Sequence, residues 1–315
     1  MSAASGPGVD SVRVVIGPLG GTGIAEAVAA VPGITPVLVD HPADMPAALA
    51  GDAVVVTFLW KDEWLTDSLR WIQSVSAGTD QFGADRLRVH GVVLTSSRGI
   101  YEIPVSEHAI GLLLAMTRGI ATAARDQAGH RWGRLTLREI SGMTLGVLGL
   151  GTIGEGIARR AAGLGMRVIG TKRHPEGYRG AAEEVFPPEK TLEVFEKADA
   201  VVITLPGSSE TAGLVGAAEL EALRGGWLVN VGRGSVVDLP ALVAAMERGI
   251  LAGAALDVFD EEPLPPTSPL WDLPGVVITP HVAGLSSRYG ERLAGVFARN
   301  LAAYRGQGEW HNRVV

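Results

Sequence analysis

The hydrophobic pattern of the chain predicts two series of alternating strands and helices. In the first series, helical segments separate the short apolar runs as far as the run at 71–76, and one more apolar run then follows without a predicted helix. Strands that alternate with helices indicate a parallel sheet covered on both faces. The strands expected in this series are 12–17, 34–39, 53–59, 71–76 and 92–96.

A long helix that is apolar nearly all round is expected to begin at Pro104, and such a helix should be buried. A second strand series follows it and is long enough for a complete dinucleotide-binding domain. Its expected strands are 143–148, 166–170, 200–205, 227–231, 252–256 and 276–278, and its expected helices are 192–197, 217–223 and 239–248.

A last helix, roughly 286–304, has no strand after it, so we expect it to cross back to the first domain. The predicted domains are therefore 1–99 together with 285–315, and 100–284. The expected fold class is α/β, with two doubly wound parallel sheets.

A glycine-rich turn lies at the start of the second series. Gly149, Gly151 and Gly154 have the G-x-G-x-x-G spacing, with a strand before them and a helix after them. The first glycine allows the tight turn, the second lets the backbone approach a pyrophosphate, and the third lets helix and strand pack closely. We therefore predict dinucleotide contacts at these glycines and at Thr152 and Ile153, where the first amides of the helix face an anion.

An earlier glycine cluster, 17–23, also follows a strand. Its spacing matches neither the dinucleotide fingerprint nor a phosphate-binding loop that ends in Lys-Ser or Lys-Thr. We interpret it as a plain turn.

Composition narrows the function classes. The formal net charge of −7 argues against a nucleic-acid partner, and the chain has no cysteine for a disulfide or a thiolate metal site. No metal site is predicted. Residues 1–10 lack the features of a signal peptide, and no apolar run reaches the length of a membrane span. We expect a cytoplasmic protein with a short flexible N-terminus and no membrane partner.

Three side chains that could do chemistry follow strands of the second series. Arg233, Glu262 and His281 come after separate strands, whose carboxyl ends lie along one crevice in a parallel sheet. A guanidinium can grip a carboxylate with two hydrogen bonds, and an imidazole can exchange a proton near neutral pH. A neighbouring carboxylate would fix the tautomer of the imidazole and favour its charged form. We therefore predict that these three side chains form one site. His108, on the long helix, is expected instead to pack against its neighbours or to cap the helix.

The loop 74–80 ends a strand of the first series and contains the small residues Ala77 and Gly78, followed by Thr79. Its backbone amides could face the carboxylate of a substrate, or the loop could be a turn in which Asp80 caps the next segment. Both readings stay open. Trp60, at another strand end, is expected either to line the substrate pocket or to pack.

The motifs G-L-G-x-I-G, N-V-G-R-G, D-V-F-x-x-E-P and T-P-H-x-A-G occur here in that order. Together they resemble the D-2-hydroxyacid dehydrogenase family over essentially the whole chain. The resemblance implies a Rossmann cofactor domain inserted in a flavodoxin-like substrate domain, and a homodimer. It also implies that 76–80 is the substrate-carboxylate loop.

Site roles follow from the same resemblance. Arg233 would orient the substrate, His281 would donate the proton, and Glu262 would be the partner of His281. Asp257 would contact the nicotinamide carboxamide. We also expect cofactor contacts at Leu205, Pro206 and Thr211.

The chain departs from the NAD pattern after the strand 166–170. An acidic residue that would bind the ribose hydroxyls of NAD is missing, and Lys172, Arg173 and His174 stand there instead. Cations suit a 2′-phosphate, so we expect NADP to be preferred, with NAD possible. If Lys172 and Arg173 only point into solvent, both cofactors could work.

The predicted function is the reduction of a 2-oxoacid to a D-2-hydroxyacid, and the reverse. Glyoxylate and hydroxypyruvate are the first candidate substrates, followed by larger apolar oxoacids. A formate dehydrogenase of the same fold is an alternative, although its histidine is paired with glutamine, which Glu262 argues against. A dinucleotide-binding corepressor that recruits other proteins is the other alternative.

Overall fold

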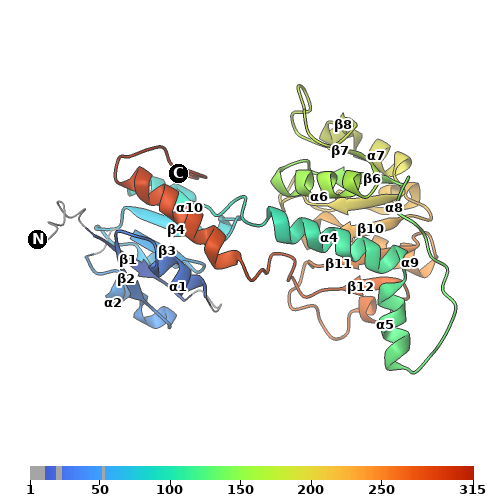
Figure 1. Cartoon of the computed structure of the whole chain (residues 1–315), viewed down its shortest axis with the longest axis horizontal. Coiled ribbons are helices and arrows are strands. Elements are labelled where there is room, and N and C mark those ends of the chain that lie inside the picture. Colours follow the sequence, from blue (N-terminus) through green and yellow to red (C-terminus); the bar gives the residue numbers. More distant parts are fainter. Residues whose placement is uncertain (1–10, 19–22, 52–53) are drawn as a thin grey trace, which may run out of the picture. The chain divides into compact units, whose positions relative to one another are not determined.

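The computed structural model describes residues 11–18, 23–51 and 54–315, and the chain divides into two compact units (Figure 1). One unit combines the chain up to Tyr101 with Ser286–Val315, and the other is Glu102–Leu285. The domain boundaries expected from the sequence lie instead after residues 99 and 284, and these boundaries stay a prediction. Residues 1–10, expected to be flexible, and 19–22 of the early glycine cluster lie outside the described residues.

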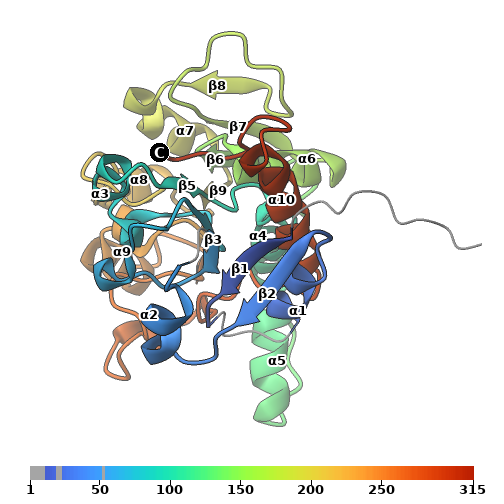
Figure 2. The same cartoon turned by 90° about the vertical axis from the view of Figure 1, so that its left-hand side faces the viewer.

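The first unit contains a five-stranded parallel sheet in the order β2-β1-β3-β4-β5. This is the flavodoxin-like order of a doubly wound sheet. Figure 2 shows β2, β1 and β3 side by side. The strands are β1 (Val12–Ile16), β2 (Ile34–Leu38), β3 (Val54–Thr57), β4 (Trp71–Ser74) and β5 (Val93–Thr95). The predicted parallel sheet is confirmed.

Helices of the first unit are α1 (Ile24–Ala29), α2 (Met45–Ala48), α3 (Ala84–Val89) and α10 (Tyr289–Tyr304). The last of them, α10, packs beside α1, as expected for a helix that crosses back (Figure 1). Phe297 of α10 stacks on Trp71 of β4 with ring centroids 5.1 Å apart. Asn300 donates to Gln73 Oε1 at 2.9 Å, so a buried amide pair also joins this helix to the sheet.

The second unit contains a seven-stranded parallel sheet in the order β12-β11-β10-β9-β6-β7-β8. The direction of winding reverses between β6 and β9, which is where ligands bind in doubly wound sheets. The strands are β6 (Thr144–Leu148), β7 (Arg167–Thr171), β8 (Glu184–Phe186), β9 (Ala200–Ile203), β10 (Trp227–Asn230), β11 (Gly253–Leu256) and β12 (Val276–Ile278). Both predicted α/β sheets are therefore present.

Helices of the second unit are α4 (Glu102–Thr117), α5 (Ile120–Ala128), α6 (Thr152–Gly163), α7 (Thr191–Lys197), α8 (Ala217–Ala222) and α9 (Leu239–Glu247). The helix α4 is buried on several sides and packs on α6, β10 and β11, which confirms the prediction from its apolar sequence. Besides α3 of the first unit, two described elements of the second unit, α5 and β8, were not predicted. No residue of α5 is buried, and β8 is a three-residue edge strand, so neither carries a strong hydrophobic pattern.

Among the described residues, no helix is long and apolar enough to cross a membrane.

Candidate active site

The turn between β6 and α6 has the backbone geometry expected for its first and third glycines, while the pyrophosphate contact expected at the second stays a prediction. Gly149 has φ 97°, in the left-handed region that favours glycine. A Cβ on Gly154 would lie 2.2 Å from the carbonyl oxygen of Gly149, so only glycine allows helix and turn to pack this closely. Gly151 is the N-cap of α6, has no side-chain cap, and a Cβ placed there would meet open space. An uncapped helix N-terminus with open space in front of it fits a pyrophosphate.

The loop after β10 is shaped by Asn230, whose side chain is buried. Its Oδ1 accepts from the amide of Gly232 at 3.0 Å, and its Nδ2 donates to the carbonyl of Arg233 at 2.9 Å. The Arg233 side chain is exposed, and its Nη1 donates to the carbonyl of Gly232 at 2.8 Å. The folded loop thus presents a guanidinium at the carboxyl end of the strand.

Close glycine packing joins three loops of the second unit. A Cβ on Gly234 would lie 2.0 Å from the carbonyl carbon of Phe259, and a Cβ on Gly232 would lie 2.6 Å from the carbonyl oxygen of Leu205. The loops after β9, β10 and β11 therefore touch through backbone that side chains would push apart. This packing explains why N-V-G-R-G needs both of its glycines.

His281 and Glu262 meet after β12 and β11. The imidazole Nδ1 lies 2.7 Å from Glu262 Oε2, and Glu262 Oε1 accepts from the amide of Phe259 at 2.9 Å. Burial by itself raises the pKa of Glu262, but the hydrogen bonds from His281 and Phe259 and the charges of His281 and Arg233 outweigh it and lower that pKa. Glu262 is therefore a carboxylate at neutral pH, and Nδ1 donates the hydrogen bond.

Asp257 has a different set of contacts from the one implied by the family resemblance. Its side chain is 1% exposed and accepts hydrogen bonds from Thr279 Oγ1 and from the amides of Val282 and Ala283. These bonds hold the loop that carries His281. A contact between Asp257 and a nicotinamide stays a prediction.

The cations after β7 have protein partners. Lys172 Nζ donates to the carbonyl of Leu150, in the glycine-rich turn, at 2.6 Å. Arg173 Nη2 forms an exposed ion pair with Glu210 Oε2 at 3.1 Å. Glu210 was not singled out from the sequence, because it lies 37 residues away from Arg173 on the loop after β9. Thr211, on the same loop, donates to the carbonyl of Pro206 at 2.7 Å.

The candidate substrate loop lies in the first unit, after β4. Ser76 Oγ donates to the carbonyl of Gly78 at 2.6 Å, which curls the loop. Among the described residues, the amides of Ala77 and Gly78 have no hydrogen-bond acceptor, and both residues are half-buried together with Thr79. This arrangement leaves two amides able to bind a carboxylate. The side chain of Asp80 is outside the description, so the capping alternative is not tested.

Trp60 belongs to the core of the first unit. Its ring stacks on Phe82 and meets Trp64 edge-on, with centroids 6.2 Å apart in both pairs, and it is 9% exposed. The structure therefore shows the packing role that the sequence left open, and a substrate role for Trp60 stays a prediction.

The second unit brings its predicted residues to one edge of its sheet. Six of these residues come after six strands that are consecutive neighbours in the sheet. In sheet order, His281 comes after β12, Glu262 after β11, Arg233 after β10, Leu205 after β9, Gly149 after β6 and Lys172 after β7. A row of this kind suits an extended dinucleotide, with the glycine turn next to Lys172 at one end and His281 at the other. Ala77, Gly78, Thr79 and Trp60 belong to the other unit.

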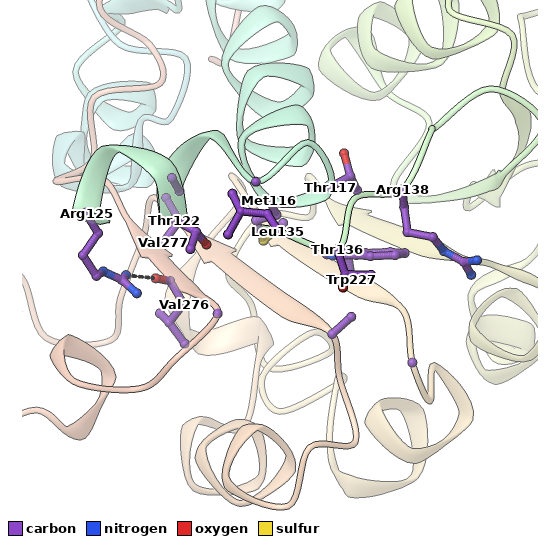
Figure 3. A pocket seen from close by; sticks show the side chains of 15 residues that line it. Met116, Thr117, Thr122, Arg125, Leu135, Thr136, Arg138, Trp227, Val276 and Val277 are labelled. Atoms are coloured by element: carbon purple, nitrogen blue, oxygen red, sulfur yellow. Dashed lines mark hydrogen bonds between the residues drawn. The ribbon is translucent and has the colours of Figure 1, made fainter. Parts of the chain in front are cut away.

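A pocket of about 520 Å³ lies at the opposite edge of the second sheet (Figure 3). It is lined by the end of α4, by the first part of α5 and by residues at the starts of β10 and β12, including Trp227 and Val276. Arg125 on its rim donates to the carbonyl of Val276. No predicted site residue lines this pocket. The predicted polar residues of the second unit lie instead at the carboxyl edge, where the His281 imidazole contacts the Glu262 carboxylate and the charge of Arg233 acts on that carboxylate.

Comparisons with known proteins identify the family of this chain. The family model "D-isomer specific 2-hydroxyacid dehydrogenase, NAD binding domain" matches residues 110–283. A glyoxylate reductase from Thermofilum pendens is 35% identical over 246 residues, which cover 75% of this chain and 72% of that protein. A glyoxylate/hydroxypyruvate reductase B from Serratia proteamaculans is 36% identical over 240 residues, covering 71% of this chain and 72% of that protein.

A solved structure shares the fold over nearly the whole chain. It is an NADPH-dependent glyoxylate/hydroxypyruvate reductase from Sinorhizobium meliloti, in complex with NADP and malonate. It is 30% identical, has a TM-score of 0.78, and the match covers 96% of this chain and 97% of that one. The chain therefore belongs to the D-isomer-specific 2-hydroxyacid dehydrogenase family, and it is an oxidoreductase that acts on a CH–OH group with a nicotinamide cofactor.

Proposed function

We propose that this enzyme reduces a small 2-oxoacid to the D-2-hydroxyacid, with His281 as the proton donor and Arg233 as the group that orients the substrate. The observation that carries the proposal is the 2.7 Å hydrogen bond between His281 and Glu262 on the edge that also holds Arg233. The names of the reductases similar to this chain support glyoxylate and hydroxypyruvate as the first substrates.

The residues divide the reaction between them. The nicotinamide cofactor, when bound, supplies the hydride that adds to the carbonyl carbon. Arg233 holds the substrate carboxylate through paired hydrogen bonds. Because Nδ1 of His281 is engaged by Glu262, Nε2 is the ring nitrogen that gives its proton to the carbonyl oxygen. Glu262 stabilises the imidazolium before this transfer, and the half-exposed ring regains a proton from water afterwards.

For the cofactor, we propose that NADPH is preferred over NADH. Lys172 and Arg173 stand at the end of β7, where NAD-specific proteins carry an acidic residue, and the similar Sinorhizobium meliloti enzyme is named NADPH-dependent. The ion pair between Arg173 and Glu210 is exposed, so a 2′-phosphate can compete for the guanidinium at little cost. A homodimer and a cytoplasmic location remain predictions.

Steady-state assays with a panel of 2-oxoacids test the reaction. Oxidation of NADPH should depend on the oxoacid, and chiral analysis should find the D-hydroxyacid from every oxoacid except glyoxylate, whose product has no stereocentre. If formate reduces NAD(P)⁺ while no oxoacid oxidises NADPH, the enzyme is a formate dehydrogenase instead. Tight dinucleotide binding without turnover of any of these substrates would favour the corepressor alternative.

A further inference from the structure

One buried carboxylate holds the segment that carries His281. The side chain of Asp257 accepts from Thr279 Oγ1 at 2.5 Å and from the amides of Val282 and Ala283, both at 3.0 Å. Its carbonyl accepts from the amide of His281 at 2.8 Å. Asp257 thus binds residues on both sides of the imidazole as well as the backbone of His281 itself.

This anchoring has a conformational reason. His281 has φ 52°, in the left-handed region that residues other than glycine seldom occupy. Such a conformation persists only where the surroundings impose it. If the anchoring were lost, the backbone at His281 could relax and turn the ring away from Glu262.

His108, on α4, adds a contact to these hydrogen bonds from outside the loop that carries His281. Its Nε2 lies 3.0 Å from Thr279 Oγ1 and 3.5 Å from Asp257 Oδ1. The hydroxyl of Thr279 has one proton, and that proton is donated to Asp257. Thr279 can therefore only accept from His108, which requires the proton of the neutral imidazole to be on Nε2.

We propose that His108 is a positioning residue for the reaction, which acts on His281 through Thr279 and Asp257. The N–H of His108 orients the Thr279 hydroxyl toward Asp257, and Asp257 then holds the His281 loop in its strained conformation. The side chain of His108 is 25% exposed, so the contact is partly shielded from water, which competes for it less than at the surface.

The tautomer of His108 is the first test, and it does not depend on any enzymatic activity. The chain has seven histidines, so the His108 ring signals can be assigned in long-range ¹H–¹⁵N spectra by their loss in His108→Gln. At mildly alkaline pH, these signals should show the proton on Nε2. A proton on Nδ1 would reverse the direction of the hydrogen bond and overturn the proposal.

Kinetics test whether the network positions the proton donor, and this part rests on the proposed function. Thr279→Val and His108→Leu should each lower kcat about 10- to 100-fold, the usual loss when a reacting group is slightly misplaced, while KM for NADPH stays within about twofold. Thr279→Ser and His108→Gln keep the hydroxyl and the N–H donor and should restore most of kcat. The kcat of the double variant should be close to that of the less active single variant, because both changes interrupt the same chain of contacts.

A matched control is available on α7. Thr191 has a buried hydroxyl that donates to the carbonyl of Pro188 at 2.7 Å, so Thr191→Val removes a comparable bond from the same unit. It should leave kcat unchanged. If Thr191→Val lowers kcat as much as Thr279→Val, or if Thr279→Val leaves kcat intact, the positioning role is wrong. An Nε2 proton on His108 in an enzyme that reduces no 2-oxoacid would instead count against the proposed function.

Discussion

His281 has one ring nitrogen tied to Glu262, and this arrangement makes the other nitrogen the proton donor in the proposed reaction. His281→Gln should lower kcat for oxoacid reduction by about 10²–10⁴, the usual contribution of a general acid. NADPH affinity, measured by fluorescence titration, should change little, since the glycine turn lies elsewhere on the sheet edge. Turnover close to wild type would remove His281 from the mechanism.

Glu262 has a lowered pKa, so it stays ionised down to acidic pH and stabilises the imidazolium form of its partner. In Glu262→Gln, the alkaline fall of the reduction rate should move to lower pH, because a neutral amide cannot stabilise that charge. The readout is the pH profile of kcat/KM. A profile that superimposes on that of the wild type would mean that the two side chains are not coupled.

The same residue predicts how acid affects stability. A group with a depressed pKa in the folded state stabilises the fold above its unfolded pKa of about 4.3, and this contribution is lost as the pH falls through the folded value. Denaturant unfolding should therefore show a smaller loss of stability between neutral and acidic pH in Glu262→Gln than in the wild type. An equal loss in both proteins would contradict the lowered pKa.

Arg233 lies exposed at the end of β10 and presents a planar guanidinium. Arg233→Lys should lower kcat/KM for the oxoacid, since an ammonium cannot make the paired hydrogen bonds to a carboxylate. Affinity for NADPH serves as the internal control and should stay near the wild-type value. A collapse of dinucleotide affinity with normal oxoacid kinetics would assign Arg233 to the cofactor site.

At the level of elements, the junction of β6 and α6 leaves no space at its third glycine. Gly154→Ala should lower stability by about 1–3 kcal/mol, typical of overpacking, and weaken NADPH binding, because the new methyl group would press on the Gly149 carbonyl. Gly163→Ala, in the last turn of the same helix, meets nothing within 4 Å and is the matched control. It should be neutral or stabilising by about 0.4–1 kcal/mol. Equal effects of the two changes in thermal unfolding would contradict the close packing.

For the whole molecule, cofactor choice should be visible in thermal stability without any turnover. A ligand at 100 times its Kd stabilises the protein that binds it by about 2.7 kcal/mol, which corresponds to roughly 5–10 °C in Tm for a unit of this size. At equal concentrations, NADPH should therefore raise Tm more than NADH does, and Lys172→Asp should remove the difference.

The control for that comparison is Lys190→Asp, which makes the same charge change in the turn after β8. Like the wild type, the Lys190→Asp variant should have its Tm raised more by NADPH than by NADH. If NADH stabilises the wild type more than NADPH does, the cations after β7 do not form a phosphate site, and Arg173 remains paired with Glu210.

The local pattern of hydrophobic residues was enough to predict most of the strands and helices. Buried parallel strands are short continuous apolar runs, so eleven of the twelve strands in the described part of the chain were predicted to within a few residues. Among these twelve, only β8, a three-residue edge strand, was missed. The glycine fingerprint and the three polar residues at strand ends are also local signals, because each stands directly after such a run. The sequence by itself therefore determined the fold class, the position of the dinucleotide turn and the candidate residues of the second unit.

Tertiary structure decided what these residues touch. The pairing of Arg173 with Glu210, the approach of Gly234 to Phe259 and the attachment of His108 to Thr279 all join segments far apart in the chain. Such contacts depend on the order of strands in the sheet and on the direction in which each loop folds back, and neither is encoded in the periodicity of a single segment. For the same reason, Asp257 was recognised in its motif, while its role as the anchor of the His281 loop emerged only from the folded chain.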